Sequence, residues 1–294
     1  MSATAPTAPP RLPQEERARG RTITVQVLRS AAEPRGKPAY QAYRVETFPR
    51  MSVLDALFTI QREQDRTLAF RYSCRLGMCG TCAVIVNGRE ALACQTQVER
   101  LGTDQITIRP LNYLPVVKDL VVDLEPFFER YRAVKPFFVP REEVARSDRP
   151  QVIKQGEGER KWVDPALGCI SCGICFSACA VVGLNPKFPG PAALNRAYTL
   201  VGDVRDGARD ERLAAAAAPD GVWRCHQLFA CASACPRHLV PTQAIRELRM
   251  EVAEAMEGPL VAPLRWLMRR KAKDDGPTLK DEGRKADAVQ ARDA

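Results

Sequence analysis

The chain has 294 residues, of which 45% are hydrophobic and 6% aromatic, and its formal net charge is +9. That length favours about two domains of roughly 100–200 residues each. No run approaches the ~20 apolar residues that a membrane helix needs, and residues 1–21 lack the apolar region of a secretory signal. The basic residues form neither a helix-turn-helix nor an aromatic-studded strand face, so we expect no nucleic-acid partner.

The first part of the chain is predicted to be a small α+β domain over residues 21–118, preceded by a disordered arm over residues 1–20. Apolar residues at helical spacing predict a helix over 52–65, where Ser52 and Asp55 suit a capping box. The pair Asn87–Gly88 predicts a tight hairpin turn. Alternating β-branched and polar residues predict strands at 21–28, 40–48, 83–86, 89–93 and 105–109.

The rest of the chain changes to helix and loop. Residues 119–160 are predicted to be a linker that contains a helix over 122–134. An all-α domain is expected over 161–260, followed by a basic and charged extension over 261–294. Apolar spacing predicts that the helices of this domain lie at 176–182, 192–202, 208–218, 226–234 and 242–256.

Eleven cysteines in three groups are the most informative feature of the sequence. Without a secretory signal we expect a reducing compartment, where closely spaced cysteines bind metals more often than they form disulfides. In the first group, a tight loop plus one distant cysteine matches the plant-type [2Fe–2S] spacing. Gly77 and Gly80 let this loop fold around inorganic sulfur and present its N–H groups. The four cysteines are Cys74, Cys79, Cys82 and Cys94.

A structural zinc site is the alternative for this first group. Zinc sites usually show two CxxC pairs, and the spacing here differs from that pattern. The sequence therefore favours a [2Fe–2S] cluster.

The second and third groups follow the spacing of bacterial two-cluster ferredoxins, in which the fourth cysteine of each run binds the other cluster. The second group is Cys169, Cys172, Cys175 and Cys179. The third is Cys225, Cys231 and Cys235, which fits the same spacing if Leu228 replaces a second cysteine. Exchange of the fourth ligands then assigns a [4Fe–4S] cluster to Cys169, Cys172, Cys175 and Cys235. It leaves Cys179, Cys225 and Cys231 for a [3Fe–4S] cluster.

Leu228 explains why one cluster has four cysteine ligands and the other has three, because a leucine side chain cannot bind iron. A [4Fe–4S] cluster with one water-bound iron is the alternative, which the apolar Leu228 and Phe229 disfavour. The sequence shows no P-loop, no dinucleotide-binding glycine motif and no Ser/His/Asp arrangement, so we expect no catalytic residue in this chain. Three different clusters without a catalytic set indicate an electron-transfer protein.

The cysteine-containing stretches resemble the iron–sulfur subunit of succinate dehydrogenase and fumarate reductase, the succinate:quinone oxidoreductases of respiratory complex II. The resembling stretches read YSCRLGMCGTCAV, LPVVKDLVVD, CISCGICFSAC and GVWRCHQLFACASACPRHLVPTQAI, within residues 22–256. The resemblance implies a β-grasp ferredoxin domain followed by an α-helical ferredoxin domain. It also implies a flavoprotein partner with FAD, where dicarboxylate chemistry occurs, a membrane-anchor partner that can carry haem, and quinone as the acceptor. The chain would lie peripherally on the cytoplasmic face of a bacterial inner membrane.

The quinone end departs from the family pattern. Many members continue after the fourth cysteine of the second group with Pro and then a Trp pair, whereas this chain has Ala180, Val181, Val182, Gly183 and Leu184. The resemblance places His226 and Leu228 near quinone, although a lone His can also be a locally satisfied structural residue.

Three further features accompany the cysteine groups. His238 is interpreted as structural or as a surface residue. Trp162 and Trp223 precede cysteine groups, and we expect them to pack against a cluster. Residues 259–273 mix apolar and basic side chains, which is typical of a segment at a membrane interface or of a helix docked on the protein itself.

Other functions remain as alternatives at this point. Another flavin dehydrogenase would tend to carry two complete [4Fe–4S] runs, which Leu228 disfavours. An iron–sulfur sensor would be expected to carry a DNA-binding motif, and a multi-zinc module would be colourless in the visible range. The direction of the reaction, the quinone type, the haem content, the number of anchor subunits and the oligomeric state are not readable from the sequence.

Overall fold

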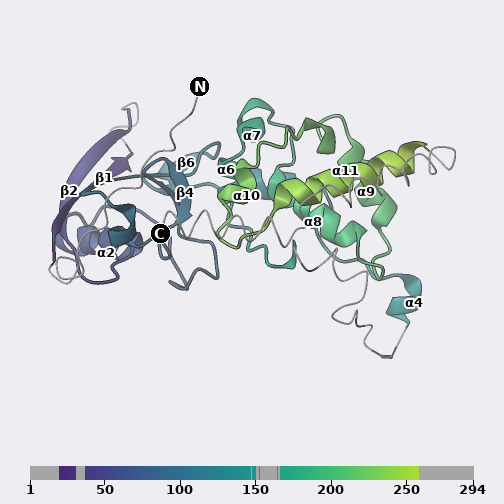
Figure 1. Ribbon diagram of the computed structural model, residues 1–294, viewed down its shortest axis with the longest axis horizontal. Helices are drawn as coiled ribbons and strands as arrows, with labels where there is room; N and C mark the ends of the chain where they lie inside the picture. Colours follow the sequence, from purple (N-terminus) through teal and green to yellow (C-terminus); the bar gives the residue numbers. More distant parts are fainter. Residues whose placement is uncertain are drawn as a thin grey trace, which may run out of the picture. The chain divides into compact units, whose positions relative to one another are not determined.

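The computed structural model describes residues 20–30, 37–146, 148–149, 152, 164 and 166–257 (Figure 1). These residues form two compact units. The N-terminal unit holds the described residues up to Leu111 together with Pro115–Asp123, and the C-terminal unit holds Asn112–Leu114 and the described residues from Leu124 onward. The described residues do not include residues 1–19 of the arm expected over 1–20, Trp162, the 259–273 segment or the extension over 261–294.

The N-terminal unit is built on a five-stranded mixed sheet in the order β2-β1-β5-β3-β4. Strand β1 pairs antiparallel with β2 and parallel with β5, while β3 pairs antiparallel with both β5 and β4. The strands are β1 (Thr22–Arg29), β2 (Ala39–Glu46), β3 (Ala83–Val86), β4 (Arg89–Leu92) and β5 (Gln105–Arg109). Helix α2 (Val53–Glu63) and the 3-10 helix η1 (Val98–Leu101) complete the unit.

The sequence pattern explains these elements. In β1 the alternating side chains of Ile23, Val25 and Val27 are buried, which places one face of the strand in the core. Helix α2 starts with the predicted capping box, because Ser52 Oγ accepts the Asp55 N–H and the Asp55 carboxylate accepts the Ser52 N–H. All five predicted strands and this helix are confirmed, with boundaries shifted by at most two residues.

A short hairpin, which the sequence did not predict, follows the sheet. It consists of β6 (Val116–Lys118) and β7 (Val121–Val122), with Asp119 at positive φ in its turn. The prediction of a helix from residue 122 was wrong at its start, because Val122 pairs with Val116 in this hairpin. The helix that follows, α3, spans only Glu125–Arg132.

Helices dominate the C-terminal unit, where α8, α9 and α11 pack against one another. After α3, its helices are α4 (Glu142–Ala145), α6 (Ile174–Ser177), α7 (Ala180–Leu184), α8 (Pro191–Val201), α9 (Arg209–Ala217), η2 (Val222–Arg224), α10 (Ala230–Ser233) and α11 (Pro241–Glu257). The described part of this unit has no strand, although Pro140 and Asp206 form an isolated bridge. In the described ranges of the whole chain, no helix is long and apolar enough to span a membrane.

Two predicted helices of this unit are corrected by the structure. The helix expected over 176–182 is divided into α6 and α7, with Cys179 in extended conformation between them. The helix expected over 226–234 is reduced to α10, because Gln227 and Phe229 have φ values of 55° and 58°, which a right-handed helix excludes. The helices expected near α8, α9 and α11 are confirmed.

A buried ion pair holds residues 135–139, which lie before the second cysteine group. Arg212 and Asp206, both 0% exposed, pair with each other. The Arg212 guanidinium also donates to the carbonyls of Lys135 at 3.1 Å and Phe137 at 2.6 Å. The Val139 N–H donates to the Asp206 carboxylate. Residues 135–139 are therefore anchored to the helical core of the C-terminal unit.

Candidate metal centres

The first group of cysteines gathers at one loop of the N-terminal unit. Cys74, Cys79 and Cys82 lie between α2 and β3, and Cys94 lies two residues after the end of β4. The β3–β4 turn has positive φ at both Asn87 and Gly88, as a tight two-residue hairpin requires. The hairpin thereby returns the chain to the loop, and the Ala93 N–H donates to the Cys82 carbonyl at 3.1 Å.

The thiols of the first group lie close enough to one another to shift each other's pKa. Burial raises the pKa of the Cys82 thiol to about 12, and the neighbouring Cys94 and Cys79 add to this shift. A hydrogen bond from Thr81, together with hydrogen bonds involving Cys74, lowers the pKa of Cys79 to about 6. The four cysteines of the first group therefore face one common site.

The backbone of this loop turns around the Cys74 sulfur. The N–H groups of Leu76 and Met78 donate to Cys74 Sγ at 3.4 and 3.3 Å. Arg75, Gly77 and Gly80 have φ values of 60°, 73° and 73°, a conformation that only glycine adopts without strain. Such a loop, with its N–H groups directed at sulfur, suits a negatively charged cluster.

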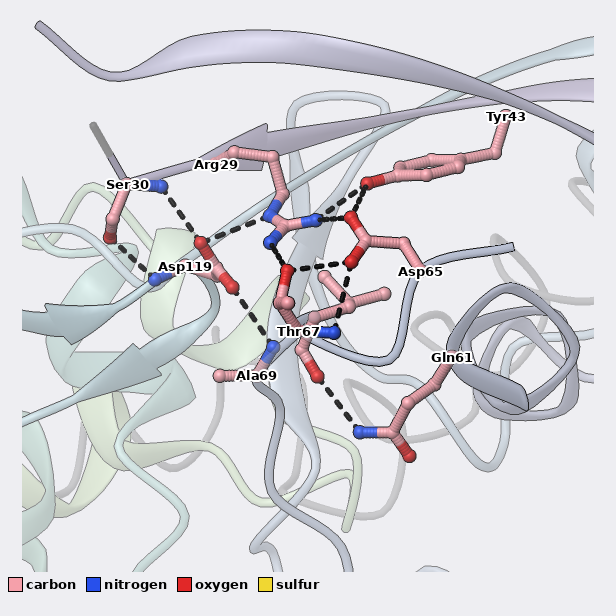
Figure 2. A network of polar contacts seen from close by, with 9 residues as sticks. Arg29, Ser30, Tyr43, Gln61, Asp65, Thr67, Ala69 and Asp119 are labelled. Atoms are coloured by element: carbon pink, nitrogen blue, oxygen red, sulfur yellow. Dashed lines mark hydrogen bonds and ion pairs between the residues drawn. The ribbon is translucent and has the colours of Figure 1, made fainter. Parts of the chain in front are cut away.

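A polar network fixes the segment that leads into this loop (Figure 2). The Asp119 carboxylate, which is 2% exposed, accepts the N–H groups of Ser30 at 2.8 Å and Ala69 at 2.9 Å. Arg29 lies between Asp119 and Asp65 and forms an ion pair with each. The N-terminal end of the loop is thus tied to the end of β1 and to the β6–β7 turn.

Aromatic contacts continue this support toward the first cysteine. The ring of Phe58, on α2, contacts Phe70 and Tyr72 edge to face, with ring centroids 5.3 and 4.6 Å apart. The Arg75 guanidinium lies over the rings of Phe58 and Tyr72 at 4.8 and 5.5 Å. The residues on both sides of Cys74 are therefore packed on α2.

The second and third cysteine groups share one backbone pattern in the C-terminal unit. Each first cysteine is followed two and four positions later by residues of positive φ: Ser171 and Gly173 in the second group, Gln227 and Phe229 in the third. Each run then enters a four-residue helix, where α6 carries Cys175 and α10 carries Cys231. This repeat places Leu228 at the position that Cys172 occupies in the second group.

Four thiols of these two groups converge on one pocket. Cys169, Cys172, Cys175 and Cys235 all line it, beside the apolar side chains of Ile170, Ala192 and Leu239. Burial raises the pKa of Cys172 to about 11 and that of Cys175 well above its usual value, and the nearby thiols of Cys169 and Cys235 add to both shifts. Four thiols that line one small apolar pocket make a cradle that fits a cluster with four thiolate ligands.

The remaining three thiols lie close to one another. Burial raises the pKa of Cys231 to about 11, with further contributions from the adjacent Cys179 and Cys225. Burial also raises the pKa of Cys179, and Cys225 adds to that shift. Cys235 thus joins the thiols of the second run at the pocket, and Cys179 lies near Cys225 and Cys231. Cys231 also adds to the pKa shift of Cys175, so the two groups of thiols are neighbours.

All eleven cysteines are free thiols. Among the described residues, no three or more His, Cys, Asp or Glu side chains could hold a single metal ion together. An iron–sulfur cluster distributes its thiolate ligands over several iron atoms, so its ligands do not have to meet at one point.

Both histidines, Leu228 and the end of α7 lie at the surface, whereas Val181 and Val182 are buried. His226, His238 and Leu228 are exposed, Leu228 by 66%, and α7 ends with Leu184 at 85% exposure. Trp223 is 43% exposed, and its indole N–H donates to the Ala217 carbonyl at the end of α9. The packing of Trp223 against a cluster stays a prediction.

Three supporting residues of these sites were missed from the sequence. The Arg249 guanidinium, on α11, donates to the carbonyls of Val222 and Cys225, both at 2.8 Å. Thr242 contacts the Cys231 sulfur, and Asp119 holds the entry to the first loop. A single Arg, Thr or Asp carries no local spacing signal, so only the folded chain reveals these partners.

Comparisons with known proteins agree with this arrangement. A family model described as a 2Fe-2S iron-sulfur cluster binding domain matches residues 24–129, and one described as a 4Fe-4S dicluster domain matches residues 165–239. The fumarate reductase iron-sulfur subunit of Haemophilus influenzae is 35% identical over 240 residues, covering 79% of this chain and 93% of the relative. The succinate dehydrogenase iron-sulfur subunit of Coxiella burnetii is 36% identical over 238 residues, covering 80% and 99%.

A solved structure is similar as well. A chain of the Mycobacterium smegmatis Sdh1 complex in the apo form aligns with a TM-score of 0.72 and 27% identity, over 82% of this chain and 100% of that chain. The match in sequence and in fold extends over both cysteine-rich parts. This chain therefore belongs to the family of iron–sulfur subunits of succinate dehydrogenases and fumarate reductases.

Proposed function

We propose that this chain relays single electrons between the FAD of a flavoprotein subunit and quinone at a membrane anchor, as the iron–sulfur subunit of a succinate:quinone oxidoreductase. The observation that carries this proposal is the sorting of eleven free thiols into sets of four, four and three. When bound, a [2Fe–2S], a [4Fe–4S] and a [3Fe–4S] cluster supply one-electron oxidation and reduction.

Each set of thiols would hold one cluster. Cys74, Cys79, Cys82 and Cys94 are assigned to [2Fe–2S]. Cys169, Cys172, Cys175 and Cys235 are assigned to [4Fe–4S], and Cys179, Cys225 and Cys231 to [3Fe–4S]. The shared pocket and the mutual pKa shifts support these assignments. Cys82, Cys231 and Cys235 are buried and the other eight cysteines are partly buried, which limits the access of water to the sites.

The domain description follows from the same assignment. The N-terminal part, residues 21–118, would be a β-grasp ferredoxin domain, and residues 161–260 would be an all-α helical ferredoxin domain. Residues 119–160 would connect them, with an arm over 1–20 and an extension over 261–294. The mixed five-stranded sheet with α2 and the helices from α6 onward support this description.

The surface near the three-thiol set supports the proposed partners. Trp223, Leu228 and Phe229, which flank Cys225, have large exposed apolar side chains. Because soluble proteins bury such side chains where they can, their exposure beside cysteines suits contact with a membrane anchor and with quinone near His226 and Leu228. The subunit would then sit on the cytoplasmic face of a bacterial inner membrane.

Electron paramagnetic resonance of the purified complex tests the proposal. A [3Fe–4S] cluster has an odd number of unpaired electrons when oxidised, so the oxidised complex should give a signal. The other two clusters are silent in that state. Succinate should then reduce the complex and generate a [2Fe–2S] signal. A silent oxidised complex that shows two [4Fe–4S] centres on reduction would point instead to another flavin dehydrogenase.

The physiological direction needs a separate measurement. The relatives include a fumarate reductase subunit at 35% identity and a succinate dehydrogenase subunit at 36%, so similarity favours neither direction. Comparing the rates of succinate oxidation and fumarate reduction by the complex with its native quinone distinguishes the two.

A further inference from the structure

The Cys231 sulfur has a hydroxyl neighbour on a different helix. Cys231 lies in α10 and Thr242 is the second residue of α11, and Cys231 Sγ lies 3.0 Å from Thr242 Oγ1. Both residues are buried, Cys231 with 7% and Thr242 with 1% of its surface exposed. Figure 1 shows α10 beside the start of α11, and the two helices contact each other.

The position of Thr242 leaves its hydroxyl available to the sulfur. Thr96 and Thr199 donate their hydroxyls to the main-chain carbonyl four residues earlier, Thr199 to Asn195 at 3.0 Å within α8. For Thr242 that residue is His238, which precedes the first turn of α11. The hydroxyl is therefore directed across to α10 rather than back along its own helix.

The protonation state of a metal-bound cysteine fixes the direction of this hydrogen bond. In a free thiol either atom could be the donor. A cysteine that binds iron has lost its proton, so the hydroxyl must donate and the sulfur must accept. Because both side chains are buried, the local dielectric is low and the hydrogen bond is electrostatically stronger than it would be in water.

We propose that Thr242 donates a hydrogen bond to the Cys231 thiolate and thereby raises the reduction potential of the three-thiol cluster. A hydrogen bond to a ligand sulfur stabilises the more negative, reduced state of a cluster, and such bonds are among the determinants of cluster potential. Thr242 thus makes this centre a better electron acceptor. The inference rests on the proposed function, which assigns Cys231 to that centre.

The experiment is a redox titration of the purified complex, monitored by electron paramagnetic resonance. Thr242→Val keeps the shape of the side chain and removes the hydroxyl, and Thr242→Ser keeps the hydroxyl. Thr199→Val is the matched control, because it removes another buried threonine hydroxyl of the same unit that bonds to a carbonyl instead of a sulfur. We expect a lower midpoint potential for the three-iron signal in Thr242→Val alone, with the [2Fe–2S] potential unchanged in every variant.

Several outcomes overturn the proposal. One is an unchanged potential in Thr242→Val, and another is an equal shift in Thr242→Ser. Loss of the three-iron signal and of bound iron in Thr242→Val would show that Thr242 is needed for assembly of the site and would overturn the tuning role. A wild-type complex without the oxidised-state signal would instead refute the proposed function, so the two failures are distinguishable.

Discussion

The guanidinium Nε of Arg29 lies 3.1 Å from the Asp119 carboxylate, and Arg21 lies at the same distance from Asp104 in the same unit. The two ion pairs differ in burial, because the Asp119 side chain is 2% exposed and that of Asp104 is 69% exposed. Breaking a buried pair leaves an uncompensated charge, whereas exposed pairs are weakened by solvent.

We therefore expect Asp119→Ala to destabilise the N-terminal unit by about 3–5 kcal/mol, and Asp104→Ala by less than about 1 kcal/mol. Loss of the visible [2Fe–2S] absorption on heating measures the difference. Since Asp119 accepts the Ala69 N–H, its variant should also release the first cluster at lower temperature. Equal effects of the two substitutions would contradict the structural role of Asp119.

The raised pKa of Tyr43 predicts that the N-terminal unit loses stability at alkaline pH. Burial, together with the hydrogen bond to Asp65, raises the pKa of Tyr43 to about 12. The neutral phenol is therefore favoured in the folded state. This contribution to stability is complete below the usual tyrosine pKa of about 10 and is lost as the pH rises toward 12. Melting temperatures should fall more steeply for the wild type than for Tyr43→Phe between pH 10 and pH 12, and parallel curves would count against this explanation.

Two glycines that precede cysteine groups should differ in how far their replacement by alanine lowers the stability of the protein. A Cβ at Gly221 would lie 2.1 Å from the main-chain oxygen of Ala216, whereas one at Gly168 would meet only the Leu239 side chain at 3.5 Å. Gly221→Ala must shift the backbone that leads to Cys225, at a cost of about 1–3 kcal/mol or more. Gly168→Ala should be nearly neutral. Thermal unfolding and bound iron measure both, and a stable, iron-replete Gly221→Ala protein would contradict the prediction.

The hydrogen bonds of Arg249 predict that Arg249→Ala selectively damages the three-thiol site. Its guanidinium donates to the carbonyls of Val222 and Cys225, so Arg249→Ala removes both of these hydrogen bonds. The Val222 carbonyl keeps only the Cys225 N–H, and the segment that carries Cys225 is loosened. We expect a lower three-iron signal and unchanged [2Fe–2S] intensity. Arg246→Ala, on the same helix but half exposed, is the control. Equal loss of both clusters would indicate global unfolding instead.

The cysteine ligands could be predicted from their spacing in the sequence. The supporting residues were missed because they depend on contacts that form only in the folded chain. Cysteine spacing is set by cluster geometry, so it can be read before any tertiary contact is known. The turn at Asp119 and its bond to Ala69 join residues far apart in sequence, for which no local pattern exists. The helix wrongly expected from His226 failed because Gln227 and Phe229 adopt positive φ, which non-glycine residues rarely do.

Leu228 provides the most direct test of the proposed cluster types. The backbone repeat gives Leu228 the position of Cys172, with residues of positive φ on both sides in each run. Leu228→Cys would therefore place a fourth thiol beside Cys179, Cys225 and Cys231. We expect the oxidised-state signal to disappear and the iron content to rise by about one atom per complex, since four thiolates suit a [4Fe–4S] cluster. Electron paramagnetic resonance and iron analysis measure both changes.

Leu228→Ala separates the thiol from the loss of the leucine. It removes the same exposed side chain without offering a ligand, so the three-iron signal should remain. If the alanine variant lost the signal as well, the apolar side chain itself would protect the site. If Leu228→Cys kept the three-iron signal, position 228 would not face the cluster. Retention in Leu228→Ala together with conversion in Leu228→Cys means that the missing thiolate alone limits this site to three irons.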